Sequence, residues 1–269
     1  MRANSVLYHD VISDGDCDAS GFKGAGAAVY KVERSDFERH MATIAQLIPG
    51  GPVTALDLLG GAVHSNPFLL TFDDGGVSAI QLIADHLDQY SWVGHFLITT
   101  DQVGSPTFLS REQICELRRR GHIVGSHSHS HPKRMSTCGR RWLVEEWKTS
   151  VRILSDILGE QVLVASVPGG YYSRMVAETA ASEGIRALFT SEPTPSCHFV
   201  TNCLVLGRYT VRHTTQASVA AGFASGRLAP RVRQWLLWKA MQIPKLAGGE
   251  QWLNFREAWL RRSSCWHNR

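Results

Sequence analysis

Phe68-Leu69-Leu70-Thr71-Phe72-Asp73-Asp74-Gly75 decides the fold, because a strand pattern ends there abruptly in two acids and a glycine. The residues before the acids are apolar or β-branched, which is typical of a strand covered on both faces in a parallel sheet. Two adjacent carboxylates raise each other's pKa unless a cation holds them. A divalent metal would do so, with one carboxylate as ligand and the other free to accept a proton. The alternative is an Asp-Asp-Gly turn that has no role in metal binding or catalysis.

A second stretch, residues 121–132, is strand-like up to Val124 and then turns. It carries His127, His129 and His131 at alternate positions. His127 and His131 also have the spacing i, i+4, so a helical turn would place both on one face. Neutral imidazole is the commonest nitrogen ligand of zinc and similar ions. Three histidines within five residues therefore predict metal binding, whereas a single histidine would more often serve packing.

Together the two stretches resemble the first two motifs of the polysaccharide deacetylases, the family four carbohydrate esterases with the nodulation-protein-B homology domain. Residues 71–75 resemble the motif with the acid pair, and residues 127–132 resemble the motif His-Ser/Thr-x-x-His. The resemblance covers roughly residues 5–215. It implies an α/β fold, a distorted (β/α) barrel of about seven parallel strands with C-terminal helices.

The remaining chain fits this fold, because strand and helix patterns alternate along it. Helix patterns cover residues 79–90 and 142–158, and a strand pattern covers 92–99. Such alternation is typical of βα units with a parallel sheet. The length of 269 residues and the hydrophobic content of 43% suit one barrel. We therefore expect a catalytic domain over residues 1–226 and an extension over 227–269.

Composition and chain ends set further expectations. No run of about 18 apolar residues occurs, so we expect no transmembrane helix. The first four residues lead directly into a strand without the apolar region of a signal peptide, which predicts a cytoplasmic protein. The cysteines form no Cys-x-x-Cys pair, so we expect six free thiols. They are Cys17, Cys115, Cys138, Cys197, Cys203 and Cys265.

The resemblance implies roles for the acids and histidines. Asp74, His127 and His131 would bind a divalent cation, in the first place Zn²⁺, with Co²⁺, Ni²⁺ or Mn²⁺ as alternatives. Asp73 would take the proton from the attacking water. His129 lies outside the ligand set of the family pattern.

The segment 162–172 resembles the third motif of the family, usually Arg-x-Pro-x-Gly, but Ser166 stands in place of the arginine. In the family this arginine supports the catalytic aspartate. We predict that Arg208, near a later strand end, replaces it in space, and we also count Arg208 among the substrate-binding residues. A backbone N–H near Gly169 and Gly170 would polarise a carbonyl oxygen. Tyr171 would flank a sugar, although an aromatic residue after a turn is as often simple packing.

The fourth and fifth motifs are not recognisable, so the general acid has two candidates. His9 follows the first predicted strand, where sites gather in parallel barrels. His213 follows the strand pattern over 204–211. We expect one of these two histidines to protonate the leaving amine.

We therefore predict a metal-dependent hydrolase that removes an N-acetyl group from an amino sugar in a polysaccharide, an oligosaccharide or a lipid-linked glycan. One alternative is a deformylase or a cyclic-amide hydrolase on the same scaffold. Another is a non-catalytic homologue that binds sugar or metal, which Ser166 and the missing later motifs would suit. The expected partner is a carbohydrate substrate.

The segment 227–269 differs in composition from the rest of the chain. It holds nine Lys/Arg and two acids, and five of the eight tryptophans. Its pattern predicts helices over 231–243 and 250–262, separated by Pro244 and two glycines. These helices would close the barrel, or would attach the protein peripherally to anionic lipid at the inner membrane face. No recognised nucleic-acid-binding fold accompanies the segment, so we expect no nucleic-acid partner.

Overall fold

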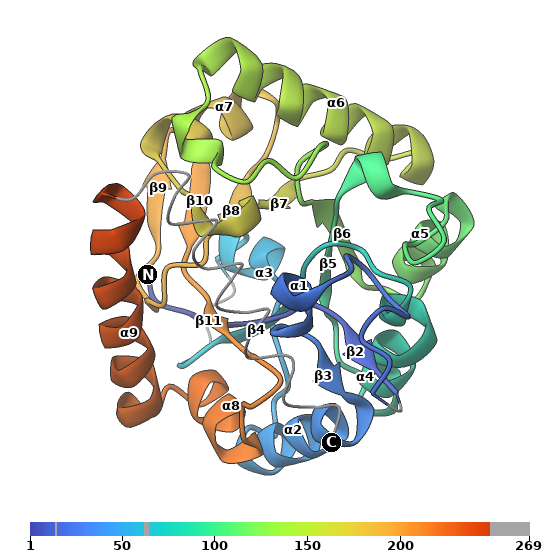
Figure 1. Cartoon of the computed structure of the whole chain (residues 1–269), viewed down its shortest axis with the longest axis vertical. Helices are drawn as coiled ribbons and strands as arrows, with labels where there is room; N and C mark the ends of the chain where they lie inside the picture. Colours follow the sequence, from blue (N-terminus) through green and yellow to red (C-terminus); the bar gives the residue numbers. More distant parts are fainter. Residues whose placement is uncertain (14, 62–64, 248–269) are drawn as a thin grey trace.

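The computed structural model describes residues 1–13, 15–61 and 65–247, with side chains described up to residue 241. One strongly curled sheet organises the molecule, in the strand order β11-β1-β4-β5-β6-β7-β8-β10-β9 (Figure 1). All neighbouring pairs are parallel except β9 and β10. The order begins with β11 and ends with β9, so the sheet is an open half-barrel. The predicted distorted barrel is confirmed.

The elements alternate as the sequence predicts. The strands of the main sheet are β1 (Asn4–Tyr8), β4 (Phe68–Phe72), β5 (His95–Ile98), β6 (Ile123–Ser126), β7 (Val164–Ser166), β8 (Ala187–Phe189), β9 (His198–Val200), β10 (Cys203–Leu206) and β11 (Tyr209–Thr210). A small sheet pairs β2 (Val11–Ile12) with β3 (Val32–Glu33). The helices are α1 (Ala25–Ala28), α2 (Arg34–Leu47), α3 (Ala55–Leu59), α4 (Ala84–Gln89), α5 (Arg111–Arg119), α6 (Arg140–Leu158), α7 (Arg174–Ser182), α8 (Ala217–Ala224) and α9 (Leu228–Ala247).

Strand β4 lies between β1 and β5 and is buried along its whole length. Phe68, Leu70 and Phe72 point into the core between the sheet and the outer helices. Leu69 points into a smaller core inside the curl, where Ala55 of α3 also packs. Burial of both faces explains why the predicted strand is almost continuously apolar.

Helix α9 corrects one prediction. It begins at Leu228 and runs through Pro244 to Ala247, so the expected break at Pro244 is wrong. Proline lacks the backbone N–H group and so removes one helical hydrogen bond. Pro244 lies in the last turn of α9, so the helix ends soon after this loss. Pro230 lies in the first turn, where backbone N–H groups have no helical partner. The second predicted helix, 250–262, lies outside the described residues.

Two smaller expectations concern cysteines and membrane spans. Five cysteines lie in the described part of the chain and all are free thiols, whereas Cys265 lies outside it. None of the helices within residues 1–13, 15–61 and 65–247 is both long and apolar enough to span a bilayer.

Candidate metal centre

The predicted motifs meet because their strands are neighbours in the sheet. Asp73 and Asp74 follow β4, His127 follows β6, and Ser166 ends β7. The order β4-β5-β6-β7 is parallel throughout, so the carboxyl ends of these strands share one edge. Asp73, Asp74 and His127 are all buried there.

Asp74, His127 and His131 have the geometry of a metal-ligand set. Oδ1 of Asp74 lies 3.4 Å from Nε2 of His127 and 3.5 Å from Nε2 of His131. All three possible ligand atoms lie within 4.8 Å of one another. A tetrahedral ion with bonds of about 2.0–2.2 Å keeps its ligand atoms roughly 3.3–3.6 Å apart. The distances from Asp74 to the two histidines thus match the spacing that such an ion requires.

The hydrogen bonding of Asp74 supports the same conclusion. Its Oδ1 atom is buried and accepts no hydrogen bond. A buried carboxylate oxygen without a donor is costly, and a cation would satisfy it. Burial raises the pKa of Asp74, but His131, His9 and His127 outweigh this effect and hold the pKa well below its ordinary value. The group is therefore a carboxylate, the form that binds metal.

A serine fixes the orientation of His127. Oγ of Ser166 donates a hydrogen bond to Oδ1 of Asp73 at 3.1 Å, and it also lies within hydrogen-bonding distance of Nδ1 of His127. The hydroxyl therefore accepts from the Nδ1–H group of His127, and the Nε2 lone pair points towards Asp74. Burial lowers the pKa of His127 to about 4. The imidazole is neutral at neutral pH, as a metal ligand must be.

Arg208 confirms the predicted replacement of the missing arginine. Its Nη1 and Nη2 atoms donate to the two carboxylate oxygens of Asp73 at 2.7 and 2.8 Å. Its Nε atom donates to the backbone carbonyl of Thr190 at 3.0 Å. Burial raises the pKa of Asp73, but Arg208 outweighs this effect and lowers it. Arg208 is fully buried and its guanidinium group is engaged with Asp73, whereas its assignment to substrate binding stays a prediction.

Gly207 shows why Arg208 can reach Asp73 from the connection between β10 and β11. A Cβ atom at Gly207 would lie 2.4 Å from the carbonyl oxygen of Glu192 and 2.5 Å from that of Thr194. Only glycine allows this close approach of two backbone segments. The following N–H group, of Arg208, donates to the Glu192 carbonyl at 2.8 Å.

A loop, not a helical turn, brings His131 back to Asp74. Residues 127–131 are not helical, and Ser128 and His131 adopt positive φ angles of 64° and 52°. The buried carboxylate of Glu146, on α6, accepts hydrogen bonds from the backbone N–H groups of His129 and Ser130. Nδ1 of His129 lies 2.9 Å from the hydroxyl of Thr100, so this ring points away from Asp74. The hydrogen bonds to Glu146 therefore stabilise the strained backbone of this loop.

The two general-acid candidates lie in different surroundings. His9 stacks on Tyr30 with ring centroids 4.8 Å apart. It follows Tyr8, which pairs with Phe72 of β4, so His9 and Asp73 leave neighbouring strands at the same edge of the sheet. His213 is exposed, and its Nδ1 atom lies 3.1 Å from the carbonyl oxygen of Val29. Both assignments stay predictions.

The Pro-Gly-Gly turn lies next to the histidine loop. Gly169 and Gly170 have positive φ angles of 62° and 70°. A Cβ atom at Gly169 would lie 3.2 Å from the carbonyl oxygen of Lys133, two residues after His131. Arg134 lies over the ring of Tyr171 at 5.5 Å. The oxyanion role of the glycines and the sugar contact of Tyr171 stay predictions.

The loop after the first strands supplies contacts that the sequence did not predict. Asp10 is buried and accepts hydrogen bonds from Ser20 at 2.6 Å and Ser78 at 2.9 Å. Lys31 is buried too, and its Nζ atom donates to the carbonyls of residues 17, 20 and 22. These contacts place Phe22 against His131, with ring centroids 4.8 Å apart. The available clue was that Asp10 directly follows His9 at a strand end.

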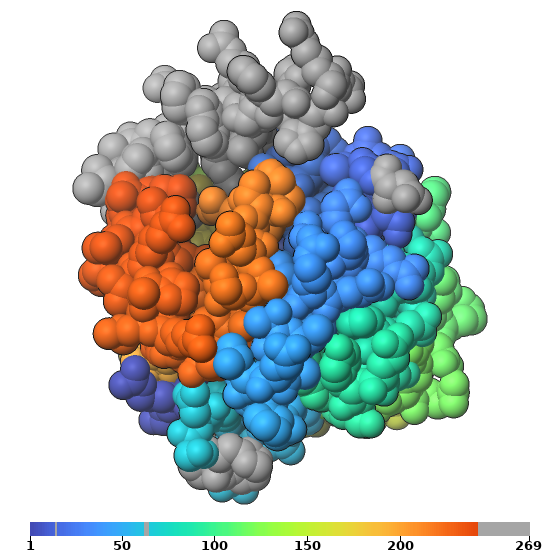
Figure 2. Space-filling model, turned by 90° about the horizontal axis from the view of Figure 1, so that it is seen from below, coloured from blue at the N-terminus to red at the C-terminus, as the bar shows by residue number. Residues whose placement is uncertain are grey.

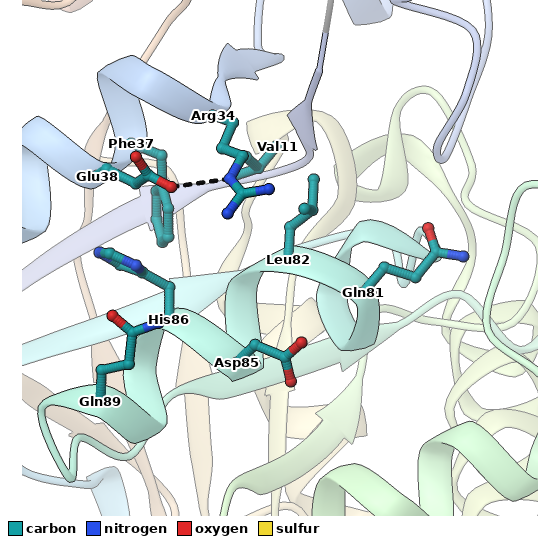
Figure 3. A pocket seen from close by; sticks show the side chains of 9 residues that line it. All are labelled: Val11, Arg34, Phe37, Glu38, Gln81, Leu82, Asp85, His86 and Gln89. Atoms are coloured by element: carbon teal, nitrogen blue, oxygen red, sulfur yellow. Dashed lines mark hydrogen bonds and ion pairs between the residues drawn. The ribbon is translucent and has the colours of Figure 1, made fainter.

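A pocket of about 150 Å³ lies elsewhere, between α2 and the helical segment 79–89 (Figure 3). Its lining includes the ion pair of Arg34 and Glu38, together with His86 and Asp85. None of its lining residues is a predicted site residue, so this pocket is not part of the metal centre.

Comparison with known proteins supports the resemblance found in the sequence. The family model of the polysaccharide deacetylases matches residues 60–188, which include the acid pair, the histidine loop and the Pro-Gly-Gly turn. No curated protein matches this chain.

Solved structures share the fold at low sequence identity. The deacetylase PplD of Streptococcus pyogenes, in complex with acetate, is 17% identical, with a TM-score of 0.67 over 81% of this chain and 96% of that one. IcaB from Ammonifex degensii is 22% identical, with a TM-score of 0.67 over 83% and 97%. A de-N-acetylase from Aggregatibacter actinomycetemcomitans is 15% identical, with a TM-score of 0.68 over 83% and 100%.

Proposed function

Because the chain belongs to the polysaccharide deacetylase family, we propose that it is a metal-dependent hydrolase that removes an N-acetyl group from an amino sugar. The substrate would be a polysaccharide, an oligosaccharide or a lipid-linked glycan. The observation that carries the proposal is the convergence of Asp74, His127 and His131 beside an Asp73 that Arg208 holds. The Streptococcus pyogenes relative is described as a deacetylase in complex with acetate, the product expected here.

The donor set of one carboxylate and two imidazoles suits zinc in a tetrahedral site with one open position. Co²⁺, Ni²⁺ and Mn²⁺ are alternatives with the same donors. When bound, the ion would act as a Lewis acid and lower the pKa of its water to about 7. Asp74, His127 and His131 would hold it, and Ser166 would keep His127 in the tautomer with a free Nε2.

Asp73 is the base in this proposal. Its two oxygens face Arg208, which keeps the carboxylate ionised and fixes its plane. Asp73 would accept the proton of the water that attacks the acetamido carbonyl. Backbone N–H groups near Gly169 and Gly170 would donate to the developing oxyanion. His9 is the favoured group to protonate the leaving amine, because it follows Tyr8, which pairs with Phe72 directly before Asp73.

The test is release of acetate from N-acetylated oligosaccharides and lipid-linked sugars, by protein stripped of metal and then given zinc or cobalt. We expect release that depends on added metal and is lost in Asp73→Asn. A parallel assay for formate and for ring opening of cyclic amides separates the alternative hydrolases. Protein that retains metal but hydrolyses none of these amides would contradict the proposal and favour a non-catalytic binding protein.

A further inference from the structure

Helix α9 is attached to the edge of the sheet largely through polar side chains. The amide of Gln234 accepts from the backbone N–H of Thr210 at 3.0 Å and donates to its carbonyl at 2.8 Å. Nε of Arg231 donates to the hydroxyl of Tyr209 at 2.8 Å, and Nη1 donates to the carbonyl of Gly226 at 2.8 Å. The helix thus directs hydrogen-bonding groups towards β11, whereas a surface helix usually directs its apolar face towards the protein.

The opposite side of α9 is apolar and exposed. Leu228, Val232, Trp235 and Leu236 have the spacing i, i+4, i+7, i+8 and therefore form one face. They are 70%, 44%, 39% and 56% exposed, and Leu237, about 100° further round the helix than Leu236, is 54% exposed. These five are the majority of the nine large exposed apolar side chains in the described part of the chain. Such a concentration marks an interaction surface. Figure 2 shows α9 in red-orange along one side of the molecule.

The charges around this face are of one sign. The sequence of α9 contains no acidic residue. Arg227, Arg233 and Lys239 are exposed beside the apolar residues. Nζ of Lys239 lies over the rings of Trp235 at 5.6 Å and Trp238 at 5.3 Å. Tryptophan paired with a cation on an amphipathic helix suits the headgroup region of a membrane.

A basic pocket lies at the beginning of the same helix. Its volume is about 230 Å³, and Arg2, Arg231, Asn4 and Asn66 contribute its polar side chains together with Ser65. No acidic residue lines it. Arg2 and Arg231 make this pocket basic, which suits an anionic lipid headgroup. Arg231, in the first turn of α9, is the residue through which the helix contributes to this pocket.

We propose that α9 docks the protein on the surface of an anionic membrane, with the apolar face (Leu228, Val232, Trp235 and Leu236) at the headgroup–acyl boundary. The positive charge of α9 decides which partner binds to this face. A second copy of this chain would bring a basic helix against a basic helix across a two-fold axis. The segment 248–269 carries four arginines against two glutamates, so it is also basic. An anionic bilayer offers apolar contact and opposite charge together.

The test is flotation of the full-length protein with vesicles of phosphatidylcholine, with and without phosphatidylglycerol, at low and high salt. We expect flotation with the anionic vesicles at low salt and a marked reduction at high salt. Leu228→Ser and Leu236→Ser should each weaken partitioning about tenfold or more, since each removes an exposed apolar side chain that the membrane would bury. Arg233→Gln and Lys239→Gln should each weaken it roughly fivefold.

Matched controls are available on other surfaces. Phe199→Ser and Trp142→Ser remove side chains that are 56% and 41% exposed, and Arg141→Gln removes an exposed cation. We expect these variants to float like the unmodified protein. Full-length protein that stays with neither vesicle type at low salt, or α9 variants that float like the controls, would overturn the proposal.

The oligomeric state shows whether a second copy of the chain, and not a membrane, covers the apolar face. Light scattering without lipid should show the same mass for the unmodified protein and for Leu236→Ser. A dimer that dissociates in Leu236→Ser would assign the face to a second copy and overturn the proposal. The result does not depend on catalysis, because α9 variants should release acetate from a soluble substrate at the unmodified rate.

Discussion

Asp73 and Asp74 are neighbours in the chain, yet their carboxylates contact different side chains. Asp74 faces two histidines and accepts no hydrogen bond at Oδ1, whereas both oxygens of Asp73 are held by Arg208. The φ angle of 78° at Asp74 turns the second side chain away from the direction of the first. Two adjacent acids thus acquire two different environments, one suited to a cation and one suited to a proton.

Arg208 should matter for stability as well as for catalysis. Arg208→Met leaves the buried Asp73 without its counter-charge, so we expect the free energy of unfolding to fall by about 3–5 kcal/mol. The double variant Arg208→Met/Asp73→Asn should recover part of this loss, because no buried charge is left unpaired. Urea unfolding of the single and double variants measures both effects. Additive losses in the double variant would mean that the two side chains do not stabilise each other.

Ser166 should act on the metal through His127. Ser166→Ala removes the acceptor of the Nδ1–H group, so we expect zinc affinity to fall about 10–100-fold. The measurement is a zinc titration against a competing chelator, without substrate. Ser5→Ala is the matched control, because Ser5 is also buried at a strand but its hydroxyl has no hydrogen-bond partner. Equal zinc affinity in both variants would show that Ser166 does not position His127.

The sequence predicted the acid pair and the histidines because each group is contained within a few consecutive residues. It also indicated Arg208, but only as the basic residue at a later strand end. The bidentate contact could not be predicted, because Arg208 and Asp73 are 135 residues apart and only the curl of the sheet brings them together. The Glu146 and Lys31 contacts were missed for a different reason, since each joins a side chain to the backbone of an irregular loop 9 to 17 residues earlier, whose path the sequence does not predict.

At the scale of elements, the site depends on β4, β6 and β7 ending at one edge. The continuous apolar pattern of β4 and the glycine turns that follow β4 and β7 predicted this arrangement. The capping box of Ser110 and Gln113 at the start of α5 was also predictable from sequence. The C-terminal extent of α9 was not predictable, because whether a helix continues through Pro244 depends on where the proline lies within the helix.

His95 ties three elements together and should make the fold acid-sensitive. Its Nδ1 donates to the carbonyl of Leu70 in β4, and its Nε2 accepts from the N–H of Ala55 in α3. A proton on Nε2 would face this N–H group. Burial therefore lowers the pKa of His95 to about 4, despite the carbonyl of Leu70 and the carboxylate of Asp57.

The unfolded chain takes up this proton near the ordinary pKa of about 6.5, so the free energy of unfolding should fall as pH falls from 6.5 to 4, by a few kcal/mol. His95→Gln keeps one donor and one acceptor but cannot titrate. We expect its unfolding free energy to depend less on pH within this window, as measured by urea unfolding at several pH values. The same slope in both proteins would contradict the role of His95.

At the scale of the whole molecule, α9 relates the membrane proposal to the metal centre. The helix starts near Gly226 and Asn4, at the amino end of β1, and reaches Thr210, which pairs with Leu7 near the carboxyl end of that strand. Its second turn therefore lies near the carboxyl end of β1, at the edge of the sheet that carries the metal cluster. A membrane along α9 would place the site close to lipid-linked substrates.

The central claim is that Asp74, His127 and His131 bind the metal while Asp73 moves the proton. The most direct measurement is metal content by elemental analysis, paired with acetate release, for Asp74→Ala, His127→Ala, His131→Ala and Asp73→Asn. We predict that the first three variants lose the metal, whereas Asp73→Asn retains it and loses turnover by a factor of about 10²–10⁴. If Asp73→Asn loses metal as completely as His127→Ala, the division of roles between the two acids is wrong.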